Sequence, residues 1–138
     1  VTELGFEADA LTPDGLTALA ASALFGRLNE LELRALRIPS ALLVDSLSAA
    51  TEPGVLSRLA LPFNRIGRDD AEALFRLPAA ADLRHLDLSD NPLGTDGVAA
   101  LAGGGVVRGL RVLNLSKTLR GVLGGNALAE AGGLAGLR

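Results

Sequence analysis

Leucine and other large aliphatic residues recur along this chain at a nearly fixed interval. Residues 83–93, which read LRHLDLSDNPL, follow the spacing L-x-x-L-x-L-x-x-N-x-L. Similar stretches begin at residues 1, 28, 56 and 110, so the copies are separated by 27, 28, 27 and 27 residues. A period in this range indicates one structural unit per copy, with each unit stacked on its neighbours.

The first half of each copy has the polarity pattern of a β-strand. Leu86 and Leu88 alternate with polar residues, as in a strand that buries one face. Because the copies are nearly equal in length, the same positions should lie side by side in successive strands. The pattern therefore predicts five parallel strands near residues 4–6, 31–33, 59–61, 86–88 and 113–115.

The second half of each copy predicts a short helix. Thr12 followed by Pro13 is typical of a helix start, with a capping side chain and then a proline in the first turn. In the fourth copy we expect Thr95 or Asp96 to cap a helix, after a corner that Gly94 makes easier.

An asparagine or a replacement for it follows each strand. Its amide can both donate to and accept from loop backbone groups, so a column of such residues can hold the loops of adjacent units together. We expect Asn91 to be buried and bonded in this way, with no ligand role. Leu36 takes this position in the second copy and should weaken the bonding there. The predicted structural column is Asp9, Asn64, Asn91 and Thr118.

This strand–loop–helix unit resembles the leucine-rich repeats of the ribonuclease-inhibitor-like subfamily. The most specific segment is N-x-L-G-x-x-G at residues 91–97, and the resemblance covers the whole chain. That subfamily often has cysteine in the asparagine column, and this chain has none. The resemblance implies an α/β fold, a right-handed solenoid curved like part of a horseshoe, with parallel strands on the concave face and short helices on the convex face. It also implies binding of a protein partner through the concave face or its adjoining loops.

The repeats suggest one domain over residues 1–138, with about five units starting at 1, 28, 56, 83 and 110. The chain opens inside a strand motif, so we expect it to be a piece of a longer protein. Neither end carries the polar cap that repeat arrays require, which predicts end-to-end self-association of the isolated chain.

Composition and charge narrow the classes of partner. The net charge is −3 and aromatic residues make up 3% of the chain, so a nucleic-acid partner is not expected. No apolar run is long enough to span a bilayer, so no membrane partner is expected either. The lack of cysteine favours a cytoplasmic location without deciding it.

Strand positions that alternate with the buried leucines should line the concave face. We expect Glu30 to pair with Arg58 across two strands, and Arg34 to pair with Glu32 along one strand. Two interpretations stay open: ordinary solvated positions, or a mixed-charge docking surface with Phe63 as an apolar anchor. Phe63 could instead fold over the strand edge into the core. The candidate partner-binding residues are Glu30, Glu32, Arg34, Arg58, Phe63, His85 and Asp87.

Catalytic and cofactor chemistry is not expected. His85 is the only histidine, so a histidine-based metal cluster is excluded, and no cofactor is implied. His85 and Asp87 could form a base and its orienting group, but there is no cysteine and Ser89 has no special activation. The sequence predicts a non-enzymatic protein-binding module. Regulation of an enzyme such as a GTPase, or a spacer role in a multidomain protein, are the alternatives.

Overall fold

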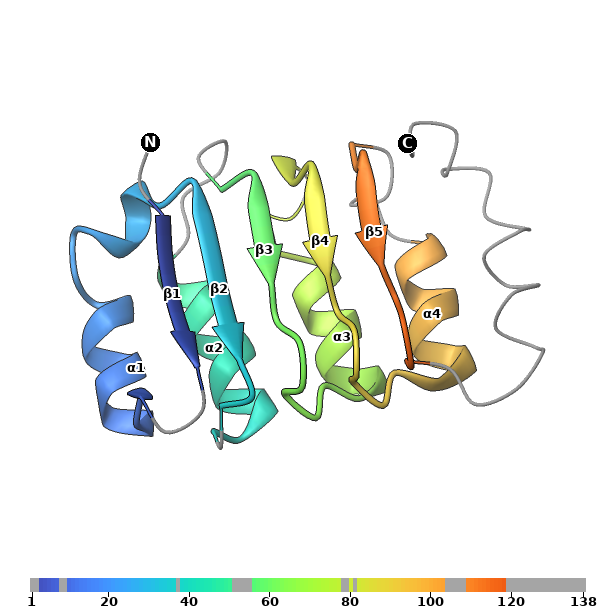
Figure 1. Cartoon of the computed structure of the whole chain (residues 1–138), viewed down its shortest axis with the longest axis horizontal. Helices are drawn as coiled ribbons and strands as arrows, with labels where there is room; N and C mark the ends of the chain where they lie inside the picture. Colours follow the sequence, from blue (N-terminus) through green and yellow to red (C-terminus); the bar gives the residue numbers. More distant parts are fainter. Residues whose placement is uncertain are drawn as a thin grey trace.

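Each repeat contributes one strand to a single parallel sheet (Figure 1). The computed structural model describes residues 3–7, 10–36, 38–50, 56–77, 80, 82–103 and 109–118. The five predicted parallel strands are confirmed, although β3 to β5 begin and end one residue earlier than expected. In chain order, which is also their order in the sheet, the strands are β1 (Glu3–Glu7), β2 (Glu30–Arg34), β3 (Arg58–Ala60), β4 (His85–Asp87) and β5 (Val112–Asn114).

The helices form a second layer behind the sheet. In Figure 1 the strands point down, each next strand lies to the right and the helices lie behind, so the crossovers are right-handed, as is usual for parallel strands. Helices pack about 8–10 Å apart and strands about 4.8 Å apart, so the array bends with the sheet on its inner face. The helices are α1 (Pro13–Ala20), a 3-10 turn η2 (Phe25–Arg27), α2 (Ser40–Ala50), α3 (Arg68–Phe75) and α4 (Gly94–Gly103).

Aliphatic side chains from every described repeat fill the space between the two layers. Leu31, Leu59 and Leu86 lie beside one another in β2, β3 and β4 and are almost completely buried. Their counterparts in the outer strands, Leu4 and Leu113, are only partly buried. The core therefore runs along the axis of the array, and each leucine column is best covered in its middle.

The register follows the repeat length. Arg58 lies between Glu30 and His85, and Ala60 lies between Glu32 and Asp87. In a parallel sheet with one side chain per strand at each level, such residues form rows across the sheet. The outward-facing rows expected from the period are therefore present in the described strands.

The helix starts agree with the sequence in one repeat and differ in another. Thr12 caps α1 as predicted, with its hydroxyl accepting a bond of 3.1 Å from the Gly15 amide. The predicted cap of α4 at Thr95 or Asp96 is wrong, because the helix already begins at Gly94. Gly94 has a φ of +66°, which turns the chain sharply after the strand loop and lets the helix begin two or three residues sooner than predicted.

A residue in the corner after each of β2, β3, β4 and β5 adopts a left-handed backbone conformation, and after β3 Arg65 does so as well, with a φ of 58°. The φ values are 52° at Ala35, 59° at Phe63, 55° at Asp90 and 59° at Lys117. Aspartate tolerates this conformation, whereas for most residues with a Cβ it costs about 1–2 kcal/mol. The repeated kink comes from the geometry of the corner, and the residue types at these positions did not predict it.

Ala35→Asn is expected to stabilise the protein by about 0.5–1 kcal/mol, because asparagine tolerates the left-handed region better than alanine. The same substitution at Ala99, an exposed position in α4, is the matched control. It should destabilise by several tenths of a kcal/mol, since asparagine is a poorer helix former. Thermal unfolding of both variants measures the two effects, and equal shifts in the same direction would contradict the assignment of strain to Ala35.

The role expected for Asp9 in the asparagine column lies outside the described residues.

Candidate docking surface

The face of the sheet that points away from the helices carries the charged side chains of the strands. Its first row consists of Glu3, Glu30, Arg58, His85 and Val112, and its second of Gly5, Glu32, Ala60, Asp87 and Asn114. Because no helix layer covers this side of the sheet, these outward positions form a continuous surface that a partner can reach.

Arg58 reaches two glutamates of the neighbouring strand. Its Nη1 atom lies 3.9 Å from Glu30 Oε2 and 3.8 Å from Glu32 Oε2, so the predicted pair of Glu30 with Arg58 is present. Both distances are long, and ion pairs at a surface contribute about 0–1 kcal/mol to stability. The pairs therefore do little to hold the fold. They place one cation beside two carboxylates on the strand face.

Arg34 does not pair with Glu32, contrary to the prediction. Its Nε atom lies 3.2 Å from Glu7 Oε1 on β1, and its guanidinium carbon lies 4.9 Å from the centre of the Phe63 ring. Glu7 sits directly beside Arg34 in the register, whereas Glu32 is two residues away along the strand and is engaged by Arg58. Arg34 therefore pairs with Glu7 on the adjacent strand, and Glu32 on its own strand pairs with Arg58.

Phe63 lies at the surface, so its ring does not fold over the strand edge into the core. Its side chain is 42% exposed at the loop edge of the sheet, in the left-handed corner after β3. One face of the ring meets the guanidinium of Arg34, an arrangement in which a cation is attracted to the aromatic ring. Phe63 is thus a rigid apolar side chain presented beside charged groups.

Asp87 and His85 lie on β4 of this face and are partly buried. One oxygen of Asp87 accepts a bond of 2.9 Å from the Ser89 amide, and the other accepts a bond of 3.1 Å from Asn114 Nδ2. These bonds hold the carboxylate in the turn and to the next strand, so Asp87 is not arranged to orient His85 as a base. The described residues contain no group of three or more metal-ligating side chains.

Asn64 and Asn91 connect the loops of neighbouring repeats from inside. Asn91 is 1% exposed, and its Oδ1 atom accepts bonds from the amides of Asn64 (2.8 Å) and Ile66 (3.0 Å). Its Nδ2 group donates to the carbonyl oxygens of Leu61, Leu88 and Ser89 at 2.8, 3.0 and 3.2 Å. Each asparagine thus satisfies backbone groups that a turn would otherwise leave unpaired.

The two replacements in this column behave differently. The side chain of Leu36 is buried and has no hydrogen-bonding group. The backbone amide of Leu36 nevertheless donates to Asn64 Oδ1 at 2.9 Å. Thr118 is also buried, and its hydroxyl donates to Leu115 within its own repeat at 2.7 Å. The side chain of Thr118 is too short to reach back as Asn91 does; instead its carbonyl accepts from Gly94, at 3.2 Å.

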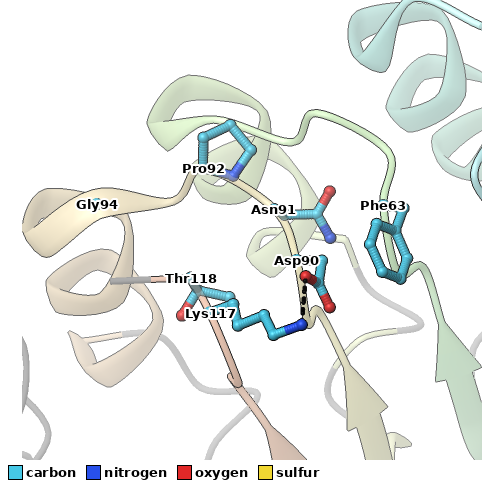
Figure 2. A pocket seen from close by; sticks show the side chains of 7 residues that line it. All are labelled: Phe63, Asp90, Asn91, Pro92, Gly94, Lys117 and Thr118. Atoms are coloured by element: carbon cyan, nitrogen blue, oxygen red, sulfur yellow. Dashed lines mark ion pairs between the residues drawn. The ribbon is translucent and has the colours of Figure 1, made fainter. Parts of the chain in front are cut away.

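A hollow of about 370 Å³ lies at the loop edge of the sheet, next to Phe63 (Figure 2). Figure 2 shows Phe63 on one side and Lys117 on another. A dashed line marks the ion pair of 3.5 Å between Asp90 and Lys117. The sequence did not predict this hollow, because it is made by corners of three repeats. Its lining residues are Phe63, Asp90, Asn91, Pro92, Gly94, Lys117 and Thr118.

Comparison with known proteins agrees with this architecture. Residues 80–102, which span β4 and most of α4, match the family described as Leucine Rich repeat. A search of curated proteins found no sequence match. In the described residues, no helix has the length and apolar character needed to cross a membrane. The repeat period and the parallel sheet with its alternating helices show the fold of a leucine-rich repeat solenoid, and the match over residues 80–102 supports a leucine-rich repeat protein.

Proposed function

We propose that this chain is a non-enzymatic docking module that binds a protein partner through the strand face and the adjoining loop edge. Leucine-rich repeats generally mediate protein–protein interaction, which supports this class of function. The observation that carries the proposal is the outward face itself. Arg58 and Arg34 lie there among glutamates of β1 and β2, and Phe63 is exposed at the edge.

The charge of this face indicates which partner surface it fits. The rows on β1 and β2 hold four glutamates (Glu3, Glu7, Glu30 and Glu32), opposed by Arg34 and by Arg58 of β3. A partner with basic residues opposite β1 and β2 is therefore electrostatically complementary.

We also propose that the repeats belong to the ribonuclease-inhibitor-like subfamily. The N-x-L-G-x-x-G segment and the period of 27 or 28 residues support this assignment. We propose that residues 1–138 form one domain.

Charge reversal at two glutamates tests this proposal. Glu30→Lys combined with Glu32→Lys should weaken binding of the protein partner at least about tenfold, because repulsion replaces attraction over β2. Asp45→Lys combined with Glu72→Lys is the matched control, since it changes the net charge equally on α2 and α3 of the helix face. Its binding should stay within about twofold of the wild type.

The experiment begins with crosslinking and affinity capture of the tagged chain in its native cells. The captured protein is then purified, and its affinity for each variant is measured by calorimetry. If the helix-face variant loses binding and the strand-face variant keeps it, the proposed surface is wrong. Equal loss in both variants would point to a general effect of charge and would also count against it.

We further propose end-to-end association of the isolated chain through β1. Leu4 and Phe6 are only partly buried, whereas their counterparts Leu31 and Leu33 are fully buried. Covering this edge with another chain would remove the apolar surface from water and pair the strand. Sedimentation velocity over a wide range of concentrations should show species larger than a monomer. A monomer at every concentration would reject the association.

A further inference from the structure

We propose that the hollow beside Phe63 binds an apolar side chain of a protein partner that is followed immediately by aspartate or glutamate. The inference rests on the proposed docking function and names the chemistry of one contact within it. Three features carry it: the placement of Phe63, the size of the hollow, and the unequal exposure of the two charged groups that line it.

Phe63 is exposed at a backbone position that suits it poorly. Phe63 has a φ of 59°, in the left-handed region that phenylalanine disfavours, and its ring remains in contact with water. The corresponding corners at Ala35, Asp90 and Lys117 share this backbone conformation, so the exposed aromatic ring is what distinguishes this corner. The side chain at this corner is alanine in the preceding repeat, aspartate or lysine in the following ones, so the corner itself does not require an aromatic group.

The dimensions of the hollow suit a short segment of a partner. Its volume of about 370 Å³ lies at the lower end of the range of about 300–1,000 Å³ typical of ligand sites. Phe63, Pro92 and Gly94 give it apolar walls, which match an aliphatic or aromatic side chain. An apolar side chain seated there would cover the free part of the Phe63 ring and remove apolar surface from water.

Of the two charged groups that line the hollow, the positive one is the more exposed to a partner. The side chain of Lys117 is 74% exposed, whereas that of its ion-pair partner Asp90 is 19% exposed. An ammonium group has three donors, so Lys117 can hold Asp90 and a second carboxylate together. A carboxylate next to the apolar side chain would therefore be attracted, and a cation at that place would be repelled.

Three synthetic peptides test this chemistry directly. They are capped at both ends and have the sequences GSLESG, GSAESG and GSLKSG, so that only the apolar or the charged residue changes. Each is titrated into the isotope-labelled 138-residue chain and followed by NMR. We expect saturable shifts of the Phe63, Asp90, Gly94 and Thr118 amides with GSLESG, and affinities at least about fivefold weaker for the other two peptides.

Substitutions in the protein test the same contact from the other side. Phe63→Ala should weaken binding of GSLESG at least about fivefold. Lys117→Glu should also weaken it, and should make GSLKSG the preferred peptide, since both charges in the hollow are then negative. Leu24→Ala is the control, because Leu24 is an equally exposed apolar residue on the helix side, between α1 and η2. It should leave binding of GSLESG unchanged.

The outcomes separate this inference from the proposed function. Absence of saturable shifts at the hollow, equal binding of all three peptides, or preference of the wild type for GSLKSG would overturn the inference. If this happens while Glu30→Lys with Glu32→Lys still weakens partner binding, the docking function stands and only the hollow is wrong. Peptide binding at the hollow with no effect of the glutamate variants on the partner would reject the strand face instead.

Discussion

Replacing Asn91 with alanine is expected to lower the free energy of unfolding by about 3 kcal/mol, because it leaves buried backbone groups without partners. The amides of Asn64 and Ile66 lose their acceptor, and the carbonyl oxygen of Leu61 loses its donor. A protein of this size has a total stability of about 5–15 kcal/mol, so the loss is a large fraction of it. Denaturant unfolding measures the change.

Asn114→Ala is the matched control for this variant. Asn114 lies on the strand face, where its side chain bonds to Asp87 and Ser116 at partly exposed sites, and water can replace these bonds. Its loss should cost less than about 1 kcal/mol. Hydrogen exchange gives a second readout, since the Asn64 and Ile66 amides should exchange faster only in Asn91→Ala. Equal destabilisation by the two variants would show that the buried position of Asn91 has no special importance.

Phe25→Ala is expected to destabilise the protein by about 3–5 kcal/mol, the range for removing a buried phenylalanine ring. Phe25 lies in the turn η2, is 2% exposed and belongs to the same buried cluster as Leu16, Leu28 and Leu31. Alanine would leave a cavity between the helix and strand layers that small aliphatic neighbours cannot fill. Thermal and denaturant unfolding both report the loss.

Phe63→Ala provides the control for Phe25→Ala, since the same ring is removed from an exposed site. We expect a change of less than about 1 kcal/mol in unfolding free energy, because water already reaches the Phe63 ring. A similar loss in both variants would mean that Phe63 belongs to the core. Cooperative unfolding of Phe63→Ala would also show that this variant is folded, as the peptide-binding experiment requires.

These predictions separate the framework of the protein from its proposed binding surface. Asn91 forms buried hydrogen bonds between loops, and Phe25 packs in the core. Neither residue belongs to the outward rows of the strand face. Glu30, Glu32 and Phe63 lie outside and form interactions that contribute little to stability. Variants at the outer residues should therefore change binding without unfolding the chain, so that the two kinds of effect can be measured independently.

The repeat length by itself determined the sheet and its register. Steps of 27 or 28 residues set each strand beside its counterpart, so the rows that contain Glu30, Arg58 and His85 follow from counting along the sequence. The leucine spacing likewise determined which strand positions are buried. These features depend on periodicity, which a solenoid converts directly into spatial neighbourhood.

Only the tertiary structure decided which side chains meet and how the corners are shaped. Arg34 contacts Glu7 of β1 and the ring of Phe63 after β3. These contacts depend on how three repeats lie next to one another. The left-handed corners after β2 to β5 accept alanine, phenylalanine, aspartate and lysine alike, so no residue type signals them. The hollow beside Phe63 exists because three such corners lie next to one another, and its shape comes from backbone geometry that no single repeat contains.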